Sequence, residues 1–460
     1  MAFEAGRFVS LALLTDRLDP PYYLGNQKAF INGGTGFQKL KDLAAVRRNR
    51  SDFFEKQTWN YIELSNLNAE RGEIIDPQIL KRDELPQRAR YKVYSGDVLV
   101  GLVRPERGAV AIIPSELDNS VASSAFAILT PVGISHELLY FILRSREVRL
   151  QISQAARGGV MPTISLSELM ELAVPVLSPA DVQELQMELP GLLEQLHSSL
   201  RQVQEIPGLV AQCLSELLPG VAEDDSLGKR DFSVPYQLLT PDRLDVVSYS
   251  PERESLLGSA AKSDLDFISL GQVAESREVG ANIKSDIFSQ QGWPVLRNTD
   301  VHPGWIEEGS AFPSQKDTKL PIVRHNQVLV SLSGSNVGMA AWVPDHLEGV
   351  TFNHSLAALD LIEGIDPRFV CIAMNSEWGQ RQLKHLQKVS GRPYLTLGAL
   401  MDFMIPQLPL SEQQELAEPV YKEIEKRRKR HRQAEQRYQE LEERYLGRGN
   451  AGDKPGNQNG

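Results

Sequence analysis

The chain has 460 residues, of which 41% are hydrophobic and 24% charged, and its formal net charge is −11. This length exceeds what one hydrophobic core usually serves, so we expect two or three domains of a folded protein. The acidic balance is mildly unfavourable for a nucleic-acid partner, although a locally basic groove would be enough to bind one.

No apolar run approaches the roughly 20 residues that span a bilayer, so we expect no membrane partner. The first residues lack the pattern of a secretion signal. The two cysteines, Cys213 and Cys371, lack CxxC spacing and are expected to be buried, reduced thiols. These features together predict a cytoplasmic protein.

The sequence repeats itself at a nearly constant interval of 226 to 234 residues. The paired blocks are Arg17-Leu18-Asp19 with Arg243-Leu244-Asp245, Tyr61-Ile62-Glu63-Leu64 with Val295-Leu296-Arg297-Asn298, Asp97-Val98-Leu99-Val100 with Gln327-Val328-Leu329-Val330, and Pro162-Thr163-Ile164 with Pro393-Tyr394-Leu395. An interval this long indicates a duplicated domain, because solenoid repeats are several-fold shorter. The duplication predicts two similar binding surfaces.

Both repeats predict the same order of elements. Short β-branched runs bounded by Gly, Pro or Ser predict strands within 98–103, 109–113 and 328–332. The residues after the first strand of each repeat, Glu106 to Val110 and Ser333 to Gly338, predict hairpin turns. A helix is predicted next, over 135–155 and about 367–389, and a proline-rich exit then ends each globular part at 174–179 and 405–409.

A long helical stretch follows each exit, over 180–218 and 411–446, with apolar residues at the 3.5-residue period of a coiled-coil seam. The predicted seam contains Leu185, Leu189, Leu192, Leu196, Val203 and Val210 in the first stretch and Val420, Ile424, Tyr438 and Leu441 in the second. Pro190 and Pro207 predict kinks or splits in the first helix, and Pro419 predicts a helix start in the second. We expect the helices to pack antiparallel, with the globular domains at opposite ends.

The predicted fold class is mixed α/β (α+β), with two tandem domains of the same fold and two long helices packed as an antiparallel coiled coil. The predicted segments are a first globular domain over 1–178, a central helix region over 179–218, a linker over 219–230, a second globular domain over 231–409, a C-terminal helix over 410–446 and a disordered tail over 447–460.

Two short motifs suggest catalysis, and each has a simpler explanation. Asp19-Pro20-Pro21-Tyr22 has the residue types of an amino-methyltransferase site, but its counterpart is Asp245-Val246-Val247-Ser248 and no glycine-rich AdoMet loop is found. Asp317-Thr318-Lys319 fits a loose nuclease pattern that nothing upstream completes. Without a Walker A sequence or zinc spacing among the eight histidines, neither ATP hydrolysis nor a metal site is predicted. His302, His325, His346 and His354 are expected to be surface or turn residues.

A basic run lies in the second long helix and contains Lys422, Lys426, Arg427, Arg428, Lys429, Arg430 and Arg432. These side chains could contact phosphate. A solvated helix face is an equally good interpretation, because Glu423 and Glu425 dilute the charge.

The order of these blocks resembles the DNA-specificity subunit of type I restriction–modification systems. The blocks that carry the resemblance are the Arg-Leu-Asp start, Gly96-Asp97-Val98-Leu99-Val100, the hairpin, the helix segment Leu139 to Ser145, the segment Gly158 to Ser165 and the helix opening Ser411-Glu412-Gln413-Gln414. The resemblance covers nearly the whole chain. It departs at Pro190 and Pro207 in the helix and at Asn326-Gln327, where the second repeat lacks Gly-Asp.

The resemblance implies a non-catalytic subunit whose two target-recognition domains each read half of a bipartite duplex DNA site. The long helices would set the gap between the half-sites. The implied partners are DNA, two adenine-methyltransferase subunits and translocase/nuclease subunits, and AdoMet, ATP and Mg would bind those subunits rather than this chain. Two other hypotheses are a specificity-like scaffold of another phage-defence system and a free-standing adenine methyltransferase that uses Asp19 to Tyr22.

Loop residues with suitable chemistry are the candidates for base contacts. They are Arg104, Arg107, Arg157, Lys284, Arg297, Ser335, Asn336, Arg392 and Tyr394. Arginine can bind guanine with two hydrogen bonds and asparagine can bind adenine in the same way. The alternative at each position is a solvated loop residue or a contact within the fold.

Overall fold

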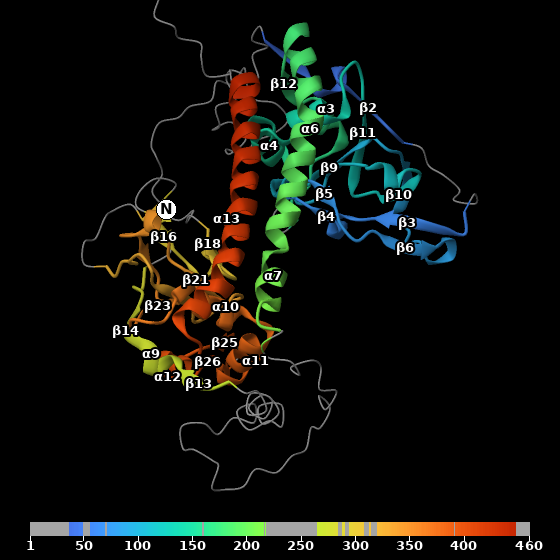
Figure 1. The fold of residues 1–460 in the computed structure, drawn as a ribbon. Helices are drawn as coiled ribbons and strands as arrows, with labels where there is room; N and C mark the ends of the chain where they lie inside the picture. The colour runs from blue at the N-terminus through green and yellow to red at the C-terminus, as the bar shows by residue number, and fades with distance from the viewer. Residues whose placement is uncertain are drawn as a thin grey trace, which may run out of the picture. The chain divides into compact units, whose positions relative to one another are not determined.

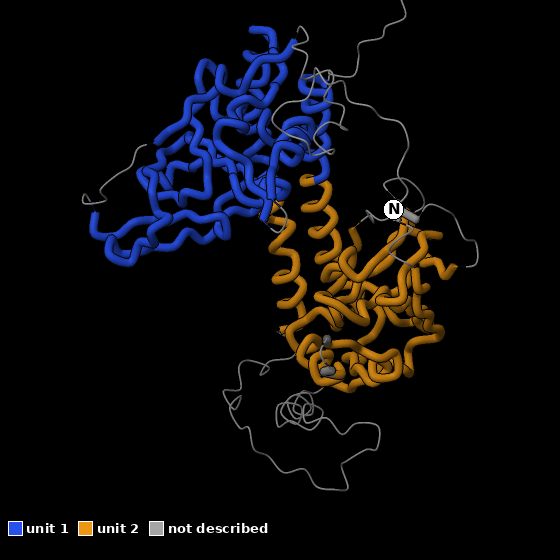
Figure 2. Tube along the Cα trace, turned by 180° about the vertical axis from the view of Figure 1, so that it is seen from behind, with its two compact units in different colours: residues 1–198, 432–460 blue, residues 199–431 orange. Residues whose placement is uncertain are grey.

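The structure is a computed structural model, and it describes residues 36–48, 56–69, 71–158, 161–215, 217, 265–283, 288–289, 294–307, 312–313, 320–390 and 392–447. The chain forms two compact units, unit 1 with residues 1–198 and 432–460 and unit 2 with residues 199–431 (Figure 2). The motifs at 17–23, 243–249 and 317–319, the linker 219–230, residue Lys284 and the tail from 448 lie outside the described residues.

Unit 1 is built on a four-stranded antiparallel sheet in the order β2-β11-β8-β9. Figure 1 labels β2, β9 and β11 of this sheet. Its strands are β2 (Ala44–Val46), β8 (Val98–Gly101), β9 (Val110–Ile112) and β11 (Phe126–Pro131). A second sheet has the order β6-β3-β10-β7 and is made of β3 (Thr58–Ile62), β6 (Gln78–Lys81), β7 (Ala89–Val93) and β10 (Ser120–Ser123). Shorter pairs join β1 (Phe37–Lys39) to β12 (Ala173–Pro175) and β4 (Leu67–Asn68) to β5 (Glu73–Ile74).

Unit 2 repeats the first four-stranded sheet of unit 1, as the sequence repeat predicts. Its four-stranded sheet has the order β14-β23-β20-β21 and is made of β14 (Ala274–Val279), β20 (Val328–Ser331), β21 (Ala340–Trp342) and β23 (Leu356–Leu361). The smaller pairs are β13 (Phe267–Ser269) with β26 (Met404–Pro406), β16 (Val295–Leu296) with β22 (Thr351–Phe352), β17 (Val301–His302) with β18 (Trp305–Ile306), β15 (Phe288–Ser289) with β19 (Phe312–Pro313) and β24 (Lys388–Ser390) with β25 (Arg392–Tyr394). The predicted strands and hairpin turns of both repeats are therefore confirmed.

The single helix predicted after each sheet is wrong, because each is two helices. The pair in unit 1 is α3 (His136–Arg144) and α4 (Arg146–Ala155), and the pair in unit 2 is α10 (Pro367–Asn375) and α11 (Glu377–Leu386). A short helix follows each pair, α5 (Leu166–Met170) in unit 1 and α12 (Leu397–Met401) in unit 2, and α9 (Leu270–Val273) precedes the sheet of unit 2. Ser145 and Ser376 separate the helix pairs. Each serine has extended backbone angles, and its hydroxyl accepts a hydrogen bond from the third residue of the next helix. This N-cap starts a new helix where the apolar pattern continues.

The long helices are α6 (Pro179–Gln204), α7 (Ile206–Gln212) and α13 (Leu410–Leu441), which ends in a π-helical turn (Glu442–Leu446). The predicted break near Pro207 is confirmed, since α6 ends three residues before it. Pro190 does not split α6, and the alternative of a kink there stays a prediction. The start predicted at Pro419 is wrong, because this proline lies inside α13. A proline removes one backbone donor, and the buried flanking residues Leu189 and Val420 offset that loss.

Both units contain antiparallel helix pairs. In unit 1, Glu184 contacts Arg444 at 3.1 Å and Glu188 contacts Arg437 at 2.6 Å. In unit 2, the Ser199 hydroxyl lies 3.1 Å from His431 Nδ1, and Arg427 donates to the carbonyl of Gln202 at 3.0 Å. In each unit the residue numbers rise along one helix as they fall along the other.

The predicted seam residues lie in the cores of the two units. Unit 1 buries Leu185, Leu189, Leu192 and Leu441 and packs Leu196 and Tyr438 against them, while unit 2 buries Val210, Val420 and Ile424 and packs Val203 against them. Cys371 is fully buried in unit 2, and burial raises the pKa of its thiol. Cys213 directly follows the end of α7 and is only half-buried, so the prediction of two buried thiols is wrong there.

Candidate nucleic-acid interface

In unit 1, two loops bring the candidate arginines together. The loop after β8 contains the 3-10 turn η5 (Pro105–Arg107), and the second loop precedes α5. Arg104 has left-handed backbone angles, and its amide donates to the carbonyl of Pro162 at 2.8 Å. Arg157 exchanges two backbone hydrogen bonds of 2.8 Å with Thr163. Arg104, Arg107 and Arg157 therefore lie on adjoining loops.

Arg149 of α4 is a fourth arginine near these loops, and sequence reasoning missed it. A Cβ added to Gly108 would lie 2.9 Å from Arg149 Nε, so the guanidinium lies beside the hairpin turn. Arg107 and Arg149 are exposed. Arg149 could have been found only by knowing that α4 packs on η5, because nothing local in the sequence links the two segments.

The Arg157 side chain is already partly engaged. Its guanidinium forms a 2.7 Å ion pair with Glu168, although half of the side chain stays exposed. Burial acts to raise the pKa of Glu168, but hydrogen bonds from Ser165 and the charge of Arg157 outweigh it and lower that pKa. Arg157 therefore carries less net positive charge toward a ligand than Arg107 or Arg149.

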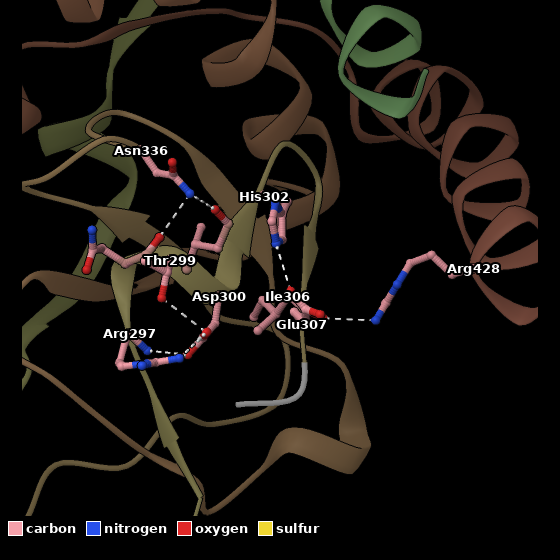
Figure 3. A network of polar contacts seen from close by, with 10 residues as sticks. Arg297, Thr299, Asp300, His302, Ile306, Glu307, Asn336 and Arg428 are labelled. Carbon is pink, nitrogen blue, oxygen red and sulfur yellow. Dashed lines mark hydrogen bonds and ion pairs between the residues drawn. The ribbon is translucent and has the colours of Figure 1, made fainter. Parts of the chain in front are cut away.

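In unit 2, the candidates lie on the equivalent loops but have different chemistry. The amide nitrogen of Asn336 donates to the carbonyls of Asn298 and Val301, at 3.2 and 3.1 Å (Figure 3). Ser333 forms a β-bridge with Tyr394, which is 38% exposed. The loop of Ser333 to Gly338, the turn η10 (Asn298–Asp300) and strand β25 therefore form one cluster.

The remaining candidates of unit 2 differ in the exposure and the ion pairing of their side chains. Ser335 is exposed, whereas Arg297 forms an ion pair with Asp300 at 3.2 Å (Figure 3). The backbone of Arg392 lies in β25. The unit 1 cluster thus offers guanidinium groups, while the unit 2 cluster offers mainly hydroxyl and amide groups.

A second basic surface of unit 1 was also missed. The exposed cationic side chains on and beside the sheet β6-β3-β10-β7 are Lys56, Lys81, Arg82, Arg88 and Arg90. Arg88 pairs with Glu63, and Lys56 donates to the carbonyl of Asn119 at 3.1 Å. The available signal was the run Lys81-Arg82 followed by Arg88-Ala89-Arg90-Tyr91-Lys92, a cluster of five cationic residues within twelve positions.

Most of the basic run on α13 binds protein groups. Lys422 pairs with Glu418 at 2.5 Å and Lys426 with Glu423 at 3.3 Å. Arg427 pairs with Glu423, and Arg428 donates to the carbonyl of Ile306. Lys429 and Arg430 are exposed and have no ion pair within the described part of the chain. The run is therefore mainly structural.

The remaining candidate sites do not favour a nucleic-acid ligand. A hollow of about 790 Å³ in unit 2 is lined by Glu275, Asp360, Glu363 and Asp366 among others, and such acids repel phosphate. The described residues contain no group of three or more potential metal ligands, and no described helix could cross a membrane. His325, His346 and His354 are exposed as predicted, whereas His302 is partly buried and its ring stacks on that of Trp305.

The fold places the chain in a known class. It matches the crystal structure of a type I restriction–modification S subunit from M. genitalium with a TM-score of 0.50 and 14% identity, over 89% of this chain and 95% of that one. The chain therefore has the fold of a type I specificity subunit.

A curated relative agrees with the fold. The chain is 22% identical over 331 residues to the specificity subunit of the type I restriction enzyme HindI from Haemophilus influenzae, a match that covers 65% of this chain and 69% of the relative. No protein-family model matches. The resemblance predicted from the sequence is thus confirmed by one sequence relative and by the fold.

Proposed function

We propose that the chain is the non-catalytic DNA-specificity subunit of a type I restriction–modification complex and that it reads a bipartite duplex site. The observation that carries this proposal is the pair of loop clusters, built on the same scaffold but with different side chains. A shared scaffold suits two ligands of one kind, and different side chains suit two base sequences.

Arg107 and Arg149 would contact one half-site, together with phosphate contacts from the basic sheet surface of unit 1. Ser335, Thr299 and Tyr394 are the exposed groups of unit 2 that suit hydrogen bonds to bases or sugars in the other half-site. Methyltransferase subunits would bind AdoMet and methylate adenine. Translocase/nuclease subunits would supply ATP- and Mg-dependent cleavage.

The test is methylome sequencing of a host that carries the complete system, with and without this gene. We expect a bipartite adenine-methylation motif that disappears when the gene is deleted. A motif that survives the deletion would overturn the proposal.

The isolated chain provides the second arm of the test. Photocrosslinking with AdoMet should leave it unlabelled, while the assembled complex is labelled on its other subunits. Labelling of the isolated chain would favour a free-standing methyltransferase instead.

A further inference from the structure

A hairpin of unit 2 is fastened to the long helix α13 by a stack of three side chains. The guanidinium carbon of Arg428 lies 4.3 Å from the centre of the Trp305 ring, and Arg428 donates to the carbonyl of Ile306 at 3.0 Å. The His302 ring stacks on Trp305, with ring centres 4.2 Å apart and planes 16° apart. Glu307 lies 3.3 Å from His302 and holds its orientation (Figure 3).

The same hairpin supports the loop that carries Ser335 and Asn336. Asn336 donates to the carbonyl of Val301, which precedes His302 in β17 (Figure 3). At the turn of the hairpin, the amide of Gly304 donates to the carbonyl of Ala340 at 3.0 Å. A continuous path of contacts therefore joins the candidate reading loop to α13 through the pair β17-β18.

Unit 1 has a contact at the equivalent place. His197 of α6 precedes Arg428 by 231 residues, the interval that also separates Pro175 from Pro406. Its Nδ1 lies 3.4 Å from a carboxylate oxygen of Glu73 in β5, the hairpin that corresponds to β17-β18. The residues differ between the copies, yet a side chain of the helix binds the hairpin in both. This indicates that the fold requires the attachment.

We infer that Arg428 is a positioning residue that holds the second reading loop through Trp305 and does not bind DNA phosphate. The inference rests on the proposed function, since it assigns a role within DNA reading. The guanidinium of Arg428 contacts the Trp305 ring and the carbonyl of Ile306, so its charge interacts with groups of the protein. Loss of the stack should loosen the loop and relax discrimination at one half-site only.

The experiment compares Arg428→Ala with Arg430→Ala in the complete complex. Arg430 is exposed on the same helix and serves as the control cation. We expect Arg428→Ala to lower discrimination at the half-site read by unit 2 by about tenfold, which is the size of one cation–π contact plus one hydrogen bond. In the methylome, that half of the motif should become degenerate while the other half stays strict.

Salt dependence separates a positioning role from a phosphate contact. Each phosphate contact contributes a slope of about −0.9 to the plot of log binding constant against log salt concentration. Arg428→Ala should leave that slope unchanged, and Arg428→Lys should restore much of the discrimination because lysine keeps a cation near the ring. Trp305→Leu removes no charge and should relax the same half-site, which guards against a folding defect specific to Arg428→Ala.

The outcomes distinguish this inference from the proposed function. A wild-type complex that methylates no bipartite motif would remove the proposed function itself. A strict motif in both Arg428→Ala and Trp305→Leu, or a slope reduced by about one unit in Arg428→Ala, would overturn the positioning role while leaving the proposed function standing.

Discussion

Units 1 and 2 contain equivalent polar networks around a carboxylate, which is buried and precedes β8 in unit 1 but is 28% exposed and lies in β23 in unit 2. In unit 1 the carboxylate belongs to Asp97, which directly precedes β8. It accepts hydrogen bonds from the amide of Tyr94 at 2.9 Å and from the hydroxyl of Thr130 at 2.8 Å, and it forms an ion pair of 2.9 Å with Arg47. Gly96 before it has a φ of +83°, which glycine adopts without strain.

In unit 2 the equivalent of Asp97 is Gln327, and the carboxylate belongs to Asp360 at the position of Thr130. Gln327 accepts from the amide of Arg324 at 2.7 Å and donates to Asp360 at 3.0 Å. Arg324 pairs with Asp360, and Asn326 keeps the left-handed backbone of Gly96 with a φ of +68°. The missing Gly-Asp of the second repeat is therefore a rearrangement of the same network.

The comparison shows what the duplicated fold retains. Each copy keeps one carboxylate, one guanidinium and one left-handed residue before the central strand. The corresponding positions nevertheless hold different residues: Gly96 and Asn326, Asp97 and Gln327, Thr130 and Asp360. Where the copies share no requirement of this kind, as in the loops of Arg107 and Ser335, they differ freely. The scaffold is thus fixed by packing and charge balance, and the loop chemistry is free to diverge.

The largest expected effect is the loss of stability when a buried leucine near the end of α13 is truncated. Leu441 of α13 is fully buried in unit 1, and Val210 occupies the equivalent place in unit 2. Leu441→Ala should destabilise unit 1 by about 2–5 kcal/mol through lost burial and a residual cavity. Hydrogen exchange resolved by peptide should show faster exchange in unit 1 peptides, with unit 2 unchanged.

Val210→Ala is the matched control for Leu441→Ala. It should affect unit 2 peptides only, and by less, because valine loses fewer carbon atoms. Equal effects of Leu441→Ala on both units would mean that the two units unfold together, which would contradict independent cores.

The second prediction rebuilds the unit 2 network in unit 1. Asp97→Gln leaves Arg47 without its carboxylate and should cost about 1–3 kcal/mol, as expected when a buried polar partner is removed. Adding Thr130→Asp returns a carboxylate at the position used in unit 2 and should recover part of that loss. Urea denaturation of the two single variants and the double variant gives the coupling energy. A double variant less stable than Asp97→Gln would break the comparison.

The sequence predicts the architecture well because its evidence is periodic. The heptad spacing of Leu185, Leu189 and Leu192 specifies a buried helix face, and the repeat assigns the same strands to both units. The helix breaks at Ser145 and Ser376 are harder to predict, since a serine within an apolar run fits either an exposed helix position or an N-cap. Only the tertiary context decides between them.

The candidate interface is predictable only in part. The loops of Arg107 and Ser335 follow from the hairpin signals, but the nearness of Arg149 to Gly108 depends on how α4 packs. Arg428 could not be separated from the phosphate-binding interpretation by sequence. Its partner Trp305 is 123 residues away in the chain, and no local pattern connects the two.

The third prediction concerns Gly304, at the turn of the hairpin of unit 2. Its φ is +82°, and an added Cβ would lie 3.1 Å from Ile424 Cδ1. Gly304→Ala should destabilise unit 2 by about 1–2 kcal/mol, from backbone strain and from this close contact. Gly349 has a φ of +83° with open space around its Cβ position, so Gly349→Ala measures the strain alone. Equal decreases of the melting temperature in the two variants would show that the hairpin accommodates the added methyl group at Gly304 without a loss of stability.

The smallest effect is the pH dependence that Asp360 adds to unit 2. Burial acts to raise the pKa of Asp360, but hydrogen bonds from Arg324, Ser276 and Gln327 outweigh burial and hold that pKa below its ordinary value of 3.8. The folded state therefore binds this proton more weakly than the unfolded state. The stabilisation is fully present above about pH 4 and is lost as pH falls through the folded pKa.

Asp360→Asn should consequently lower the urea midpoint at pH 7 and have a diminishing effect as the pH falls below about 4. Ser276→Ala removes one of the three donors and should produce a smaller change of the same kind. If Asp360→Asn shifts the midpoint equally at pH 7 and pH 3, the side chain stabilises unit 2 through packing. The carboxylate would then not be the element that the two copies retain, and the rearranged network would lose its electrostatic explanation.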